Sequence, residues 1–168
     1  MNIGVPREIK AQEGRVALLP VHFKRLTASG HTVYVESGAG QISGAADAAY
    51  RDAGATVLSG PDEVYARSTM IVKVKEILEP EYAFLKKEHI IFTTFHAALN
   101  RELLDRMLAV GLVGISADLT HQHGSPNRAL AGEIGALEGV RLSLAPHGGS
   151  GRHFMAHFGA DPSRAVVL

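Results

Sequence analysis

Three basic side chains follow apolar stretches of this sequence, and their chemistry suits a site for a small acid. Arg15 lies in a charged segment near the N-terminus, Lys75 follows an apolar run that begins at Met70, and His96 follows another that begins at Ile90. A guanidinium grips a carboxylate through two parallel hydrogen bonds. A lysine adds a second positive charge, and a histidine exchanges a proton near neutral pH. Together these groups suit chemistry on an α-keto or α-amino acid.

Each of these residues also has a purely structural interpretation. The segment 5–20 is compatible with a solvated charged loop, and His96 with a hydrogen-bonded structural histidine. Alternation along a strand would put Lys73 and Lys75 on the same side, where a flexible stem lets a strand-end lysine reach solvent. A lysine that stays buried there needs an anion or a carboxylate partner. The residue types alone leave both interpretations open.

The elements around these residues favour the functional interpretation. Short, nearly continuous apolar runs alternate with helical patterns, which is typical of a parallel sheet whose strands are buried on both faces by helical crossovers. After an opening strand, the expected strands are 32–35, 55–58, 70–74, 90–94 and 112–116, and the expected helices are 20–30, 45–53 and 100–110. The predicted fold class is α/β, with a parallel, doubly wound sheet of flavodoxin or Rossmann type. Since Arg15, Lys75 and His96 each follow a strand, we expect all three at one edge of that sheet.

The helix expected at 100–110 has the clearest sequence signals. Asn100 is a suitable N-cap and Gly111 a suitable stop. The residues expected to form its core stripe are Leu103, Leu104, Met107 and Leu108.

The composition narrows the class of protein. The 168 residues contain 17 Lys and Arg and 17 Asp and Glu, so the chain lacks the basic excess of a nucleic-acid or membrane-surface protein. There is no cysteine, which excludes disulfides, thiolate metal sites and a cysteine nucleophile. The sequence has neither a signal peptide pattern nor an apolar run long enough to cross a membrane. We therefore expect a cytoplasmic protein without nucleic acid or membrane partners.

Past Thr120 the pattern changes. A turn-rich segment, 121–127, precedes a helical pattern at 129–144, which continues in spite of three glycines. A glycine-rich loop and the apolar run Ala165–Leu168 follow. We therefore predict two parts, a domain over 1–122 and, over 123–168, a connector helix, a loop and the first strand of a further domain.

Several motifs resemble the family of alanine dehydrogenases and pyridine nucleotide transhydrogenase α subunits. They are Gly4–Lys10 (GVPREIK), Glu13–Leu18 followed by Pro20, Val35–Gly40 (VESGAG), Ile71–Glu76 (IVKVKE) and Phe92–Ala98, which contains Phe95-His96-Ala97-Ala98. The resemblance runs in register from residue 1 to about residue 118. The transhydrogenase branch usually lacks the histidine, so His96 favours the dehydrogenase branch.

The resemblance implies a reaction and roles for the matched residues. The reaction is the NAD-dependent oxidative deamination of L-alanine to pyruvate. His96 would be the general acid/base, and Arg15 and Lys75 would bind the substrate, so residues 1–122 would form the substrate-binding, catalytic domain and 123–168 the connector to a nucleotide-binding domain. The segment 161–168 resembles the lead into the first strand of the family's Rossmann domain, so NAD would bind mainly to a domain outside this chain. The chain alone would then be inactive, and its partners would be further copies of itself or a complementary nucleotide-binding domain.

The chain also departs from the family's pattern. Ala117–Thr120 stands where a Glu-Thr-Val type of segment is common, and Ala131–Ile134 where a Met-Ser-Glu pattern is usual. The alternatives are a stand-alone binding or interaction module of the same fold and a fragment of transhydrogenase type. The glycines at 148–151 lack the spacing of a phosphate cradle. His153 and His157 have no evident acidic or cysteine companion, so no metal site is predicted.

Overall fold

The computed structural model describes residues 1–96, 99–120 and 126–149. The chain divides into two compact units, Met1–Thr120 and His121–Leu168. The expected boundary lay between residues 122 and 123, close to this division. The separate functions assigned to the two parts remain predictions.

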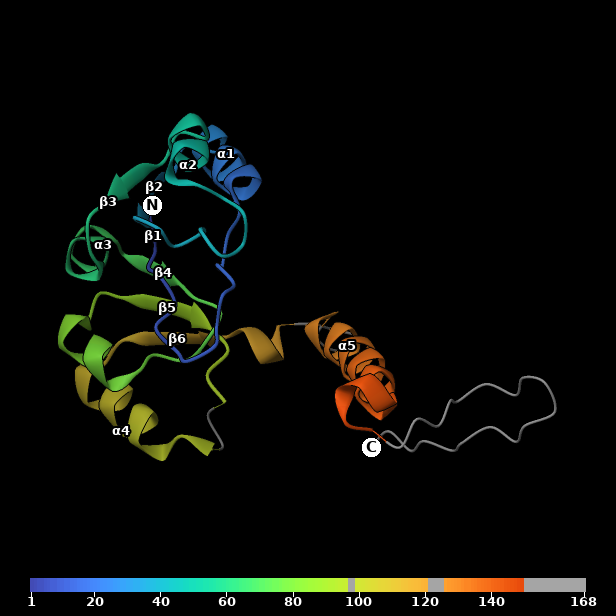
Figure 1. Ribbon diagram of the computed structural model, residues 1–168. Coiled ribbons are helices and arrows are strands. Elements are labelled where there is room, and N and C mark those ends of the chain that lie inside the picture. The colour runs from blue at the N-terminus through green and yellow to red at the C-terminus, as the bar shows by residue number, and fades with distance from the viewer. Residues whose placement is uncertain (97–98, 121–125, 150–168) are drawn as a thin grey trace. The chain divides into compact units, whose positions relative to one another are not determined.

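The first unit is built on a six-stranded sheet in the order β3-β2-β1-β4-β5-β6 (Figure 1). Its strands are β1 (Asn2–Val5), β2 (Thr32–Glu36), β3 (Thr56–Leu58), β4 (Met70–Val72), β5 (Ile90–Thr93) and β6 (Val113–Ser116). All neighbouring strands are parallel, which confirms the predicted doubly wound α/β sheet. The strand order reverses between β1 and β4, and open α/β sheets place ligand sites at such a reversal.

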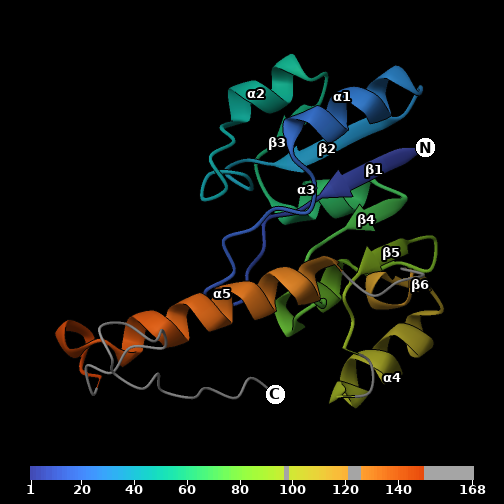
Figure 2. The ribbon, with the colours of Figure 1, turned by 90° about the vertical axis from the view of Figure 1, so that its right-hand side faces the viewer.

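Helices cover the sheet through two separate cores. The helical elements are α1 (Pro20–Ala28), α2 (Asp47–Asp52), α3 (Pro61–Arg67), η1 (Glu79–Phe84), α4 (Arg101–Val110) and η3 (Ala117–Leu119). Figures 1 and 2 show α1 and α2 together beside the β1–β3 part of the sheet. There the rings of Phe23 and Tyr50 meet edge to face at 4.8 Å. The neighbours Ile71 and Val72 belong to different cores, because successive strand residues point to opposite faces.

The second core fixes β4 and β5 against α3, η1 and α4. Its buried members are Tyr65, Ile71, Ile77, Leu85, Ile91, Phe95, Leu103 and Met107. Asn100 caps α4 by accepting a hydrogen bond from the Leu103 amide at 3.3 Å, and Gly111 ends the helix with a φ of 75°. Both were expected from the sequence. This core also holds Phe95, the residue before His96.

Two expectations about burial are wrong. Leu108 was expected in the core stripe of α4, but it is 76% exposed. The stripe is narrower than the apolar pattern suggested and is formed by Leu103 and Met107. Val113 was expected to be buried on a strand covered on both faces, but it is 54% exposed. It belongs to β6, an edge strand, and edge strands have less cover than central ones.

Helix α3 and the 3₁₀ helix η1 have no counterpart among the expected elements. The sequence does signal α3, through Gly60 as N-cap, Pro61 in the first turn and the acidic pair Asp62 and Glu63. Its seven residues are too few to produce a clear helical periodicity.

The second unit contains α5 (Pro126–Ser143) and η4 (Ala145–His147). The helix expected at 129–144 is thus present, because the glycines inside it weaken a helix without ending it. Several other predictions fall on residues that the structure does not describe. They concern the strand expected at Ala165–Leu168, His153, His157 and part of the glycine loop 148–151. In the described parts of the chain, no helix is long and apolar enough to cross a membrane.

The close packing of α3 on β1 yields a stability prediction. A Cβ added to Gly4 would lie 2.2 Å from the Ser68 hydroxyl oxygen and 2.8 Å from a methyl carbon of Val64. Gly4→Ala is therefore expected to lower the free energy of unfolding by about 1–3 kcal/mol, measured by urea denaturation. Gly132→Ala is the control, since its Cβ would meet nothing within 4 Å and is expected to be neutral or mildly stabilising. Equal stability of Gly4→Ala and the parent protein would contradict the prediction.

Candidate active site

The loop after β1 is tied to its neighbours by two glutamates. Glu36, at the end of β2, accepts a hydrogen bond from the Arg7 amide at 2.9 Å. Glu8 accepts hydrogen bonds from the amides of Val74 at 2.6 Å and Lys75 at 3.4 Å. These contacts join the loop after β1 to the end of β2 and to the loop after β4. They hold the backbone on which Lys75 stands.

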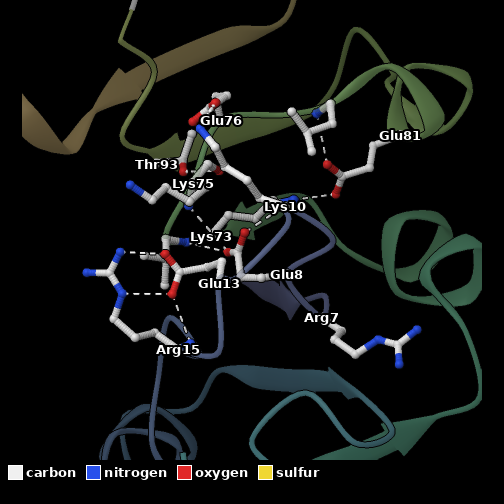
Figure 3. A network of polar contacts seen from close by, with 12 residues as sticks. Arg7, Glu8, Lys10, Glu13, Arg15, Lys73, Lys75, Glu76, Glu81 and Thr93 are labelled. Carbon is white, nitrogen blue, oxygen red and sulfur yellow. Dashed lines mark hydrogen bonds and ion pairs between the residues drawn. The ribbon is translucent and has the colours of Figure 1, made fainter. Parts of the chain in front are cut away.

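Lys73 is buried in an ion cluster, which is the second of the two interpretations that the sequence leaves open. β4 ends at Val72, so the alternation argument that grouped Lys73 with Lys75 does not extend to them. The Lys73 side chain has no exposed surface, and its ammonium lies 2.5 Å from Glu81 and 3.7 Å from Glu8 (Figure 3). The partner carboxylates that a buried lysine requires come from the β1 loop and from η1.

Further hydrogen bonds complete this cluster. Glu81 also accepts from the Tyr65 hydroxyl and from the Leu78 amide, each at 3.0 Å. Burial raises the pKa of Glu8, although the charge of Lys73 and the bonds from two amides act in the opposite direction. Burial and the neighbouring Glu81 carboxylate raise the pKa of Tyr65 well above its ordinary value, so its hydroxyl remains a donor. The cluster joins the loop after β1, the end of β4, η1 and α3.

Lys75 is oriented through its backbone. Its carbonyl accepts a hydrogen bond from the Thr93 hydroxyl at 2.7 Å, which joins the loop after β4 to the end of β5. Its side chain is half-buried, and its charge helps to lower the pKa of Glu13. The ammonium therefore lies within electrostatic reach of the carboxylate that holds Arg15.

Arg15 faces a carboxylate of its own loop. Its Nε and Nη2 donate to the two oxygens of Glu13 at 2.8 and 2.5 Å, and its amide donates to the same carboxylate at 2.9 Å (Figure 3). These bonds from Arg15 lower the pKa of Glu13 to about 2, against the effect of partial burial. The Arg15 side chain is still 53% exposed. Glu13 thus holds the guanidinium in place while leaving part of it open to an anion.

His96 lies just beyond the end of β5 with its backbone in the left-handed region, at a φ of 48°. Such a backbone conformation is uncommon outside glycine and persists where surrounding contacts impose it. The preceding residue, Phe95, is buried in the second core. The His96 ring is 43% exposed, and its Nδ1 lies 3.4 Å from Glu76, which also contacts the Lys10 ammonium.

The three predicted residues thus stand after β1, β4 and β5, which are adjacent in the sheet. A hollow of about 360 Å³ opens beside Arg15 and is lined by Arg7, Glu8, Ile9, Glu13, Gly14, Arg15, Gly38, Ala39 and Ile42. That volume exceeds the needs of a three-carbon acid. Lys75 and His96 are not among the residues that line it. Their joint action on one substrate remains a prediction.

Sequence reasoning missed the carboxylates of this site. Each of four glutamates contacts the charged group of a lysine or arginine. They are Glu8, Glu13, Glu76 and Glu81. A signal existed, since the first three stand inside the motifs that surround Arg15 and Lys75. Glu81 had no comparable signal, because it comes from η1 and meets Lys73 only in the folded chain.

The buried ion cluster makes a second stability prediction. Lys73→Met leaves two buried carboxylates without their cation and is expected to lower the free energy of unfolding by about 3 kcal/mol at pH 7. Chemical denaturation at pH 7 and pH 5 measures this, and the loss is expected to shrink at pH 5 because burial raises the pKa of Glu8, which then binds a proton more readily. Adding Glu81→Gln to Lys73→Met is expected to recover part of the loss. Lys24→Met, at an exposed site, is the control; an equally small effect of Lys73→Met would contradict the prediction.

Comparison with known proteins identifies relatives of the chain. The profile of the family "Alanine dehydrogenase/PNT, N-terminal domain" matches residues 4–131. Alanine dehydrogenase from Mycolicibacterium smegmatis is 32% identical over the whole chain, which covers 47% of that protein. Alanine dehydrogenase 1 from Staphylococcus aureus is 37% identical over 90% of the chain, which covers 41% of that protein. The chain thus spans about half the length of these curated relatives.

Solved structures agree with this. An L-alanine dehydrogenase structure superposes with a TM-score of 0.88 and 38% identity, over 96% of this chain and 46% of the other. A transhydrogenase from Sinorhizobium meliloti gives a TM-score of 0.68 and 25% identity, over 85% of this chain and 40% of the other. Sequence and structure are both more similar to the dehydrogenase, as the resemblance of the motifs predicted. On these grounds, together with the sheet and motifs described above, the chain belongs to the alanine dehydrogenase/PNT N-terminal domain family.

Proposed function

We propose that this chain is the substrate-binding part of an NAD-dependent L-alanine dehydrogenase. The overall reaction converts L-alanine, NAD and water to pyruvate, ammonium and NADH. The observation that carries the proposal is the placement of Arg15, Lys75 and His96 after three adjacent parallel strands, at the reversal of strand order. Ligand sites of open α/β sheets occur at such a place. The family membership of the chain supports the same assignment.

The proposed roles follow from the chemistry of the three side chains. Arg15 binds the substrate carboxylate with the part of its guanidinium that Glu13 leaves exposed. Lys75 supplies the second positive charge and polarises the carbonyl or imine of the substrate. His96 is partly exposed and exchanges the proton that the substrate gains or loses. Charge-assisted hydrogen bonds of this kind contribute roughly 1.5–3 kcal/mol each, which is enough to orient a three-carbon acid.

The described residues do not fit the pyrophosphate of NAD. The glycine-rich turn after β2, residues 38–44, is the nearest counterpart of a nucleotide loop. Its Gly38 amide already donates to the Asp47 carboxylate at 2.9 Å, and a Cβ at Gly40 would lie 2.5 Å from the Tyr50 hydroxyl. A carboxylate where phosphate would sit repels it. We therefore propose that NAD binds mainly to a domain that these residues do not include.

Substrate binding is tested on the chain itself with pyruvate as the probe. Arg15→Ala is expected to weaken pyruvate binding about ten- to a hundredfold, because one charge-assisted carboxylate contact is lost. Isothermal titration calorimetry measures the dissociation constant, with Arg25→Ala, on the surface of α1, as the control. Unchanged binding by Arg15→Ala would contradict the assigned role.

The chemistry is tested in a chimera in which residues 1–168 replace the matching part of the Mycolicibacterium smegmatis enzyme. NADH formation from L-alanine is expected for the chimera and not for the chain alone. His96→Ala is expected to lower turnover by roughly a hundredfold or more, while pyruvate binding changes little. His31→Ala is the control. Pyruvate binding by a correctly folded chimera without NADH formation would instead favour a binding module without catalytic activity.

A further inference from the structure

The proposed acid/base, His96, faces a carboxylate that the family assignment does not explain. We propose that Glu76 is a positioning residue for His96: it holds the Nδ1 side of the ring, stabilises the protonated ring, and is itself restrained by Lys10. This proposal rests on the proposed function for the role of His96. The geometry that carries it does not depend on that role.

The two oxygens of Glu76 have different surroundings. Oε1 contacts the Lys10 ammonium, which comes from the loop after β1. Oε2 lies 3.4 Å from Nδ1 of His96, at ion-pair distance. Oε2 is buried, and no donor among the described residues gives it a hydrogen bond. A buried carboxylate oxygen without a donor is costly, and the facing imidazole nitrogen is the group that can satisfy it.

Both partners are held from behind. Glu76 is followed by Ile77, which is fully buried in the second core, and preceded by Lys75, whose carbonyl is bonded to Thr93. His96 is preceded by the buried Phe95, and its own backbone has the constrained left-handed conformation. The two side chains therefore meet across the ends of β4 and β5 because their backbones are fixed independently.

This arrangement selects one nitrogen of the ring for chemistry. A carboxylate at Nδ1 favours the proton on that nitrogen, which leaves Nε2 as the site of exchange with a substrate. It also favours the imidazolium that forms when Nε2 takes up a proton. In alanine oxidation His96 must begin neutral in order to accept a proton. A carboxylate that stabilised the imidazolium too strongly would keep the ring protonated. Lys10 limits this effect by sharing the same carboxylate.

Glu76 is ionised at neutral pH, where His96 would exchange its proton. Burial opposes its charge, but the hydrogen bond and charge of Lys10, a backbone hydrogen bond and the contact with His96 together lower its pKa. Among the described residues, Lys10 from the β1 loop and His96 from the β5 loop are the charged or titratable groups that face this carboxylate. Glu76 and Lys10 have opposite expected effects on the proton of His96, and this difference provides the test.

The test is an NMR titration of the histidine rings in the 168-residue chain, with the His96 signal assigned by its loss in His96→Gln. Glu76→Gln keeps an acceptor and removes the charge, so the His96 midpoint is expected to move to lower pH. Lys10→Met frees the carboxylate for the ring, so the midpoint is expected to move to higher pH. Glu88→Gln and Lys24→Met, the same changes at exposed positions, are the controls and are expected to leave it unmoved.

Two opposite shifts would support the proposal, and no shift in either variant, or shifts in the same direction, would overturn it. Should Glu76→Gln fail to fold, Lys10→Met and the shorter Glu76→Asp still decide. Because the titration requires neither NAD nor turnover, its failure is separate from failure of the proposed function, which the chimera and pyruvate binding test.

If both the titration result and the proposed function hold, the acidic limb of the chimera's kcat/KM profile is expected to move in the same directions. Glu76→Ala, which also loses the acceptor, is then expected to lower kcat about ten- to a hundredfold with little change in pyruvate binding.

Discussion

The candidate site depends on a lysine that has no contact with solvent. Lys73 stands immediately after β4, and its ammonium lies between carboxylates from the β1 loop and from η1. Removing these charges from water is costly and is offset only when each carries several well-placed partners. Here Tyr65 and the Leu78 amide bond Glu81, and the amides of the β4 loop bond Glu8. If one segment moved away from this cluster, a charge would stay buried without its partner. The loops therefore have one favourable arrangement.

The exposed edge of this arrangement carries the groups proposed to bind the substrate. Glu8 connects the buried cluster to the site, because the amides it accepts from include that of Lys75. Arg15 and His96 each face a carboxylate as well, Glu13 and Glu76 respectively. Such pairing holds each side chain in place and leaves part of it exposed. Under the proposed function, a substrate would then meet side chains that are already oriented, which reduces the entropy lost on binding.

The same pairing explains why a charged loop is stable next to a hydrophobic sheet. The β1 loop carries both signs of charge, and its glutamates contact Lys73, backbone amides and Arg15. The predicted alternative of a solvated loop holds for part of it, since Arg7 and Arg15 remain more than half exposed. The inward part belongs to the fold. The same loop therefore has two roles. Its glutamates stabilise the fold, and its Arg15 is proposed to bind the substrate.

The sequence by itself determined the class of fold and the edge at which the candidate residues stand. Apolar runs and helical patterns in alternation permit a parallel sheet, and a residue that follows such a strand must lie at its carboxyl edge. The cap and stop of α4 were also legible, since Asn100 and Gly111 act locally. Only the tertiary structure decided which strands are neighbours, that Lys73 is buried while Lys75 is not, and which glutamate meets which cation. The pairs Lys73–Glu8, Lys10–Glu76 and Lys73–Glu81 join separate elements, two of them more than sixty residues apart in the chain. Burial and ion pairing depend on distances in space, and local patterns in a sequence do not contain those distances.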